Sequence, residues 1–234
     1  EKHPDVGLCG TWIQTIGEEN GAIWDYPTEH NEIKARLFFA SVLAHPSVII
    51  RRSKLKEYGL YYDPSHIHAE DYGLWQRCSF CFQIANIPEV LLKYRITSTS
   101  VSRANAERQA DTLNQLDISN LKQLGVEVDY AKLDIHQAIR SSHFSNSRQF
   151  VLEAEEWLQK LQVANHDSKR YPEPNFSILL AERWVSICTA ASGLGLWTFI
   201  RFWQSPLSQL VKFSLREKVK FAVKCGLNRE SVNE

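Results

Sequence analysis

The fold of this chain is decided by the stretch His68-Ala69-Glu70-Asp71-Tyr72-Gly73-Leu74-Trp75-Gln76-Arg77. Its two adjacent carboxylates stand where an extended segment gives way to an amphipathic helix, and Leu74 and Trp75 follow Asp71 at helical spacing. A carboxylate in that place can face a cleft. Acidic residues are also favoured in the first turn of any helix, where they meet free backbone N–H groups. Spacing alone favours helix capping as the role of Glu70 and Asp71. A functional role for them depends on the surrounding sequence.

The first hundred residues alternate predicted strands with short predicted helices, which indicates an α/β layer structure. Runs of β-branched and aromatic residues predict strands over 6–16, 22–24, 48–50, 83–88 and 90–96, the last two separated by Pro88. Apolar residues at helical spacing predict helices over 31–40, 54–58 and 70–82. Asn31 and Ser53 are the expected caps of the first two helices. A polar loop is expected over 97–102.

Beyond that loop the pattern changes to helices. A helix up to Leu124 is predicted to end at Gly125, and its apolar face carries Leu113, Leu116 and Leu121. Further helices are predicted over 148–161 and 177–191, with a proline-containing linker over 165–174. We therefore predict an α/β region over 1–103 and an α-helical region over 104–234.

The composition is that of a globular domain, with 44% hydrophobic and 23% charged residues. Lys plus Arg and Asp plus Glu both number 27, so the chain has no net charge that would attract nucleic acid or an acidic membrane as a whole. We expect no nucleic-acid partner. Five cysteines without a repeated spacing do not form a disulfide framework, which indicates a reducing cytoplasm. Cys78 and Cys81 are predicted to pack in the core.

The segment from 194 to 224 combines apolar and basic residues. Residues 194–203 are apolar nearly all round but number about half of the roughly 20 needed to cross a bilayer. From Arg201 to Lys224 six bases stand against one acid, Glu217. Such a segment can lie on an anionic membrane surface. The alternative is a terminal helix pair packed on the domain with a solvated basic face.

Five motifs match one family jointly, in order and spacing. They are Glu1 to Gly7, His45-Pro46-Ser47 with Arg51-Arg52, Tyr58 to Tyr61, Ala69 to Arg77, and Ile87 to Arg95. On these residues the chain resembles the inverting glycosyltransferases of family 2, which have the GT-A fold. The resemblance covers about 1–103. It implies the C-terminal half of a GT-A domain, followed by an α-helical region that carries no transferable motif.

In that family the preceding half of the domain binds the nucleotide and ends in an aspartate-rich motif that holds a divalent metal. The chain has no Met and begins Glu1-Lys2-His3-Pro4, so we expect it to be a piece of a longer protein that starts after this motif. Mg²⁺ or Mn²⁺ is then expected to bind upstream of Glu1, and the fragment itself is expected to be inactive. His66 and His68 alternate before Glu70 and could form a metal cluster; loop or acceptor-site histidines are the alternative.

The resemblance implies that Asp71 is the catalytic base. Inversion at an anomeric carbon needs one carboxylate within hydrogen-bond reach of the acceptor hydroxyl, on the face opposite the leaving nucleotide. Glu70 is the second catalytic candidate, to orient the acceptor or the start of the helix.

Four more residues are candidate substrate contacts. His45 belongs to the matching His-Pro-Ser motif, so we expect it in the cleft; the alternative is a buried, satisfied histidine. His68 stands just before the acidic pair and is a candidate contact to the acceptor. Trp75 is either a platform for a sugar ring or a core anchor. Arg95 either contacts an acceptor phosphate or is a structural ion-pair residue.

The predicted activity is transfer of a sugar from a nucleotide-sugar donor to a hydroxyl of a glycan or lipid-linked acceptor, at the cytoplasmic face of the membrane. Many members of the family have a His where this chain has Thr97. That departure and the basic tail leave a rival: a catalytically silent glycosyltransferase-like module that binds a membrane or a partner.

Overall fold

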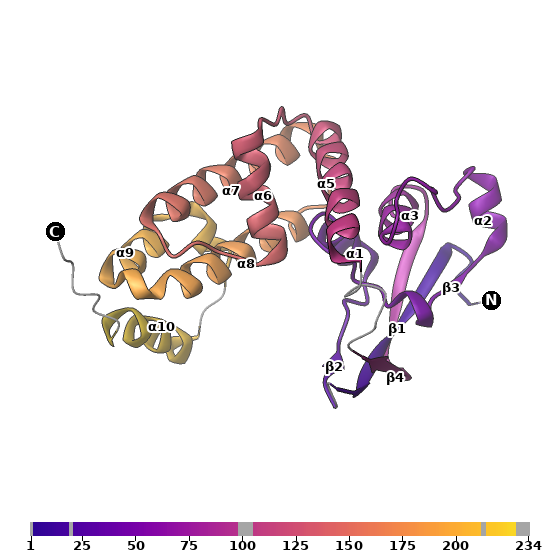
Figure 1. The fold of residues 1–234 in the computed structure, drawn as a ribbon, viewed down its shortest axis with the longest axis horizontal. Helices are drawn as coiled ribbons and strands as arrows, with labels where there is room; N and C mark the ends of the chain where they lie inside the picture. Colours follow the sequence, from indigo (N-terminus) through magenta and orange to yellow (C-terminus); the bar gives the residue numbers. More distant parts are fainter. Residues whose placement is uncertain (1, 19–20, 98–104, 212–213, 228–234) are drawn as a thin grey trace. The chain divides into compact units, whose positions relative to one another are not determined.

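The computed structural model divides into two compact units, Glu1–Asn120 and Leu121–Glu234, which are described separately (Figure 1). The structure describes residues 2–18, 21–97, 105–211 and 214–227. The expected boundary at 103/104 and most of the expected loop over 97–102 lie outside these ranges.

The first unit is built on a small mixed sheet. Its central strand is β1 (Val6–Gly17), as the sequence predicts. The parallel strand β4 (Gln83–Ile96) pairs with it from Val6 to Gly17. The short strands β2 (Ile23–Trp24) and β3 (Ile49–Ile50) pair antiparallel with two separate parts of β1, so they share its other edge.

The prediction of two strands separated by Pro88 is wrong, because β4 is continuous. Thr11 pairs with Ile87, but the next residue, Trp12, pairs with Val90. Pro88 and Glu89 therefore form a bulge, which accommodates a residue that has no N–H to give to the ladder.

The helices α1 (His30–Arg36), α2 (Arg52–Glu57) and α3 (Glu70–Cys78) belong to the same unit. Asn31 and Ser53 are not caps, because each lies inside its helix. The first helix ends at Arg36 and the third at Cys78, each earlier than predicted. Gly59 follows the end of α2 and has a φ of +61°, a left-handed conformation that suits glycine.

The core of this unit is centred on the inner face of α3. Leu74, Trp75 and Cys78 are fully buried there, against side chains from the sheet and α1. The Tyr72 hydroxyl and the Gln76 side-chain amide both donate to the Leu37 carbonyl, each at 2.9 Å. Packing and these two bonds fix α3, and so determine where its first turn points.

The helix α5 (Ala106–Gln123) contains the division between the units and is followed by Gly125 with a φ of +83°, as predicted. The second unit is helical. Its helices are α6 (Tyr130–Ser141), α7 (Arg148–Ser168), α8 (Asn175–Ala190), α9 (Leu196–Gln204) and α10 (Leu215–Leu227), with 3₁₀ turns at Ala191–Leu194 and Pro206–Leu210. The helix α6 has no counterpart among the predicted helices, and residue 165, the predicted start of the linker, lies inside α7.

The predicted apolar stripe of α7 is the core of this unit. Trp157, Leu158 and Leu161 are fully buried, together with Trp184 of α8. The Trp157 indole donates to His136 Nδ1 at 3.2 Å, which joins α7 to α6. None of the helices in the described ranges is long and apolar enough to cross a membrane.

Candidate active site

Asp71 lies in the first turn of α3, where the helix leaves the loop. Its Oδ1 accepts a hydrogen bond from the Tyr72 N–H at 2.7 Å, and Oδ2 lies 3.6 Å from His45 Nδ1. About 25% of its side chain is exposed, so a ligand can reach the carboxylate. Burial raises the pKa of Asp71, and the charge of Glu70 adds to this, while the Tyr72 N–H and His45 oppose it. A reachable carboxylate with a raised pKa suits a general base.

His45 is presented to Asp71 by a 3₁₀ turn, His45–Ser47. Pro46 suits the start of this turn because it needs no N–H there. The Ser47 hydroxyl donates to the Ala44 carbonyl at 2.8 Å and accepts from the Thr11 N–H of β1 at 3.1 Å. The central strand therefore holds the turn that carries His45.

Tyr62 completes the group and is not among the site residues predicted from the sequence. Its hydroxyl lies 3.1 Å from His45 Nε2. Burial raises the pKa of Tyr62, and the charges of Asp71 and Glu70 raise it further, so the hydroxyl stays protonated at neutral pH. A hydroxyl that donates to Nε2 leaves the ring proton on Nδ1, facing Asp71. The pair Tyr61-Tyr62 before the acidic stretch is the available sequence signal, but no spacing rule links it to His45.

Trp75 lies behind these groups. Its ring centroid is 5.8 Å from that of His45 and 6.3 Å from that of Tyr62, both edge to face. The side chain has no exposed surface, so it offers no face to a sugar ring. Of the two roles considered for Trp75, the structure is consistent with the core anchor, which supports the other two rings.

The remaining candidates have different positions. Glu70 is half-buried beside Asp71 in the first turn of α3. His68 has a φ of +62°, and its carbonyl accepts from the Gln109 side chain at 2.7 Å, so it forms the bend before the helix. Arg95 lies far along β4, where it pairs with Ile16 and is exposed. Of these candidates, the structure places His45 and Glu70 next to Asp71.

The alternating histidines do not form a metal site with Glu70. His66 packs against Gly73, where an added Cβ would lie 2.5 Å from Nδ1. Within the residues that the structure describes, no three His, Cys, Asp or Glu side chains are grouped so that they could hold a metal ion.

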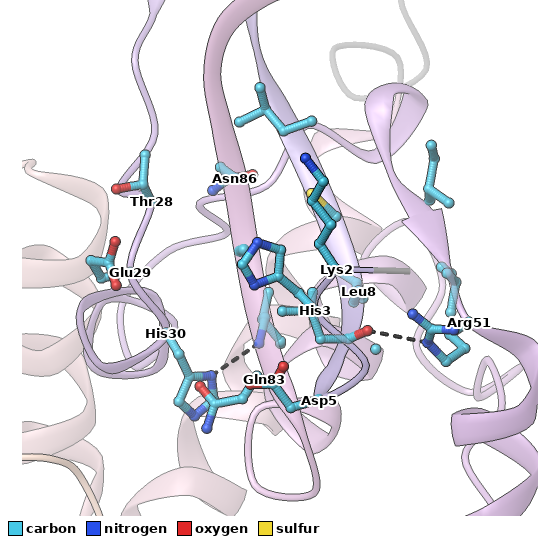
Figure 2. Close-up of a pocket in the computed structure, with 18 of the residues that line it drawn as sticks. Lys2, His3, Asp5, Leu8, Thr28, Glu29, His30, Arg51, Gln83 and Asn86 are labelled. Carbon is cyan, nitrogen blue, oxygen red and sulfur yellow. Dashed lines mark hydrogen bonds between the residues drawn. The ribbon is translucent and has the colours of Figure 1, made fainter.

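A separate hollow of about 1020 Å³ opens at the amino ends of β1 and β4 (Figure 2). His3, His30, Arg51 and Asn86 are among its lining residues, and His30 Nδ1 accepts from the Ile84 N–H at 3.1 Å. Ligand crevices of open α/β sheets lie at the carboxyl ends of strands. The hollow is therefore not at the end of the sheet where such sites are expected, and Asp71 does not line it.

Three curated relatives are named glycosyltransferases. An uncharacterized glycosyltransferase of Haemophilus influenzae is 26% identical over 142 residues, which cover 55% of this chain and 44% of the relative. The amylovoran biosynthesis glycosyltransferase AmsE of Erwinia amylovora is 31% identical over 105 residues, covering 44% of this chain and 39% of the relative. The O-antigen biosynthesis glycosyltransferase WbnJ of Escherichia coli is 34% identical over 106 residues, covering 43% and 40%.

No family model and no solved structure matches the chain. The matched regions span about two-fifths of the length of the curated relatives. The similarity is of modest identity and covers about half of this chain.

Proposed function

We propose that this chain is part of an inverting glycosyltransferase of family 2, with the GT-A fold, in which Asp71 is the general base. The observation that carries the proposal is the partly exposed carboxylate of Asp71, which has a raised pKa and lies 3.6 Å from His45. Two relatives are named for amylovoran and O-antigen biosynthesis, which supports a glycan or lipid-linked acceptor in polysaccharide biosynthesis.

The reaction is a single displacement. The acceptor hydroxyl oxygen forms a bond to the anomeric carbon of the donor sugar, while the bond from that carbon to the nucleotide diphosphate breaks on the opposite face. The Oδ2 atom of Asp71 takes the hydroxyl proton, and the diphosphate leaves with the bonding electrons. A raised pKa makes the ionised Asp71 carboxylate a stronger proton acceptor.

Glu70 and His45 set the basicity and orientation of Asp71 in this proposal. The charge of Glu70 raises the pKa of Asp71, whereas His45 lowers it. Tyr62 restrains the His45 ring from its other nitrogen. These residues act on the reaction through Asp71, so they are positioning residues.

The nucleotide-sugar donor, and a divalent Mg²⁺ or Mn²⁺ with it, are proposed to be held by parts of the protein outside 1–234. The described residues do not fit a metal ion, so no step is assigned to one here. Oxygen ligands such as aspartates are the groups that these cations prefer.

The test is Asp71→Asn in the complete protein, because Asn keeps the shape of the side chain but cannot accept the proton. A general base contributes about 10²- to 10⁴-fold, so we expect kcat to fall by that factor with donor binding unchanged. The matched control is Asp129→Asn: Asp129 caps α6, and Asn is an equally good cap. Near-normal turnover by Asp71→Asn would refute the assignment. A wild-type protein that binds ligands without turnover would favour the silent module.

A further inference from the structure

The helix α9 exposes a row of apolar side chains. Leu196, Ile200 and Trp203 are 64%, 54% and 38% exposed, and their spacing of four and three residues places them on one face. The opposite face is anchored in the second unit by Thr198 and Phe202, which are buried. Single exposed apolar residues are ordinary, but a continuous row marks an interaction surface.

The helix α10 packs beside α9. Phe221 of α10 contacts two rings of α9, with centroids 6.0 Å from Phe199 and 5.2 Å from Phe202. Val219 and Val223 are also exposed, on the side of α10 away from Phe221. We call Leu196, Ile200 and Trp203 of α9 the apolar ridge.

Cationic side chains flank the apolar ridge. Lys218 Nζ lies 5.3 Å from the centroid of the Trp203 ring, and Arg148 Cζ lies 5.3 Å from that of Trp197. Arg216 and Lys220 are exposed on α10. The acid of that helix, Glu217, accepts hydrogen bonds from the N–H and hydroxyl of Ser214. Apolar and aromatic groups ringed by cations are the chemistry of a helix that lies in a membrane interface.

We propose that the apolar ridge docks on a bilayer that contains anionic phospholipids. The apolar side chains enter the boundary between headgroups and acyl chains, the two tryptophans lie at headgroup level, and the cations meet lipid phosphates. The charge argues for a bilayer over a second copy of this chain, because a symmetric contact would bring like cations together.

The first experiment is co-sedimentation of the 1–234 chain with vesicles of phosphatidylcholine alone or with about 30% phosphatidylglycerol. We expect binding to the anionic vesicles, weakened by 0.5 M salt, and little binding to the neutral ones. Absence of binding to anionic vesicles, or equal binding to both kinds, overturns the proposal. So does a chain that self-associates through the ridge and stays off vesicles.

Two double variants distinguish the contribution of the apolar ridge to vesicle binding from that of exposed apolar side chains elsewhere. Leu196→Ser/Ile200→Ser is expected to lower the partition coefficient at least about tenfold, since each removes apolar area that enters the bilayer. The matched control is Leu152→Ser/Val163→Ser, which removes two exposed apolar side chains from α7 in the same unit. Equal binding by the two double variants overturns the proposal.

A second pair tests the cations. Lys218→Gln/Lys220→Gln is expected to lower binding to anionic vesicles at least about tenfold, since one cation near the surface is worth about fivefold. The control is Lys122→Gln/Lys169→Gln, at two exposed lysines away from the ridge. An equal effect of both variants overturns the proposal. Binding needs no donor or acceptor, so its failure would leave the proposed transferase activity untouched.

Discussion

His45 Nδ1 lies 3.6 Å from Oδ2 of Asp71, which joins the turn before β3 to the first turn of α3. Burial raises the pKa of Asp71, and the neighbouring His45 opposes that effect. The pH at which Asp71 loses its proton therefore depends on a residue from another element.

The first prediction concerns the pH dependence of turnover. Asp71 acts as a base only when ionised, so the acidic limb of the kcat profile follows its pKa. His45→Ala removes a group that lowers this pKa, so the limb moves to higher pH and activity recovers in alkaline buffer. The measurement is the pH profile of the complete protein, with His143→Ala, at an exposed histidine in the second unit, as the control. If His45→Ala lowers kcat by the same factor at every pH and leaves the acidic limb in place, His45 has a purely structural role.

The second prediction concerns Trp75. Removing a buried Trp side chain costs about 3–5 kcal/mol, so Trp75→Ala is expected to lower the free energy of unfolding by that amount. Trp24 in β2 is partly exposed, and Trp24→Ala is expected to cost less than half as much. Urea unfolding of both variants, followed by circular dichroism, gives the comparison. Similar costs for the two variants would show that Trp75 is not the anchor of this core.

The third prediction uses two helical glycines that differ in their surroundings. An added Cβ at Gly73 would lie 2.5 Å from His66 Nδ1, whereas at Gly226 it would meet none of the described residues within 4 Å. Ala is favoured over Gly in a helix by about 1 kcal/mol, so Gly226→Ala is expected to stabilise the chain. Gly73→Ala is expected to destabilise it by about 1–3 kcal/mol through overpacking.

The double variant His66→Ala/Gly73→Ala is the internal check, measured by the same unfolding experiment. Removing the imidazole gives the new methyl group room, so the penalty of Gly73→Ala should shrink in the His66→Ala background. An unchanged penalty would locate the strain in the backbone of α3 instead.

The elements that sequence could predict are those set by local pattern. The β-formers from Val6 to Ile16 predict β1, and Gly125 marks the end of a helix through its left-handed conformation. Sequence cannot show whether a proline ends a strand, because that depends on strand pairing. Pro88 predicts a strand end, but in the sheet it lies in a bulge of the continuous strand β4. The helix α6 was missed although Asp129 accepts from the Lys132 N–H as a cap.

The candidate site shows the same limit. The acidic pair and His45 carry enough local context to be chosen from sequence. Tyr62 could not be chosen from sequence, because it comes close to His45 only once the loop before α3 folds over the turn before β3. For Arg201 the sequence suggests a role that the structure does not support. It counts among the bases of the tail, but its guanidinium pairs with Glu155.

The last prediction concerns that pair. Arg201 Nε lies 2.5 Å from Oε2 of the buried Glu155, whose other oxygen accepts from the Gln159 side chain at 3.1 Å. Arg201→Met leaves a buried carboxylate without its cation, so we expect a loss of about 3–5 kcal/mol in unfolding free energy. Glu155→Leu/Arg201→Met removes both charges and should recover most of that loss.

The matched control is Lys132→Met, which breaks the pair between Lys132 and the exposed Glu156 in the same unit. An exposed pair contributes about 0–1 kcal/mol, so this variant should unfold nearly as the wild type does. If Arg201→Met costs no more than Lys132→Met, Gln159 and the surrounding packing suffice to hold the Glu155 charge. Vesicle binding by Arg201→Met should in either case match that of the wild type, because Arg201 is turned toward Glu155 and lies outside the apolar ridge.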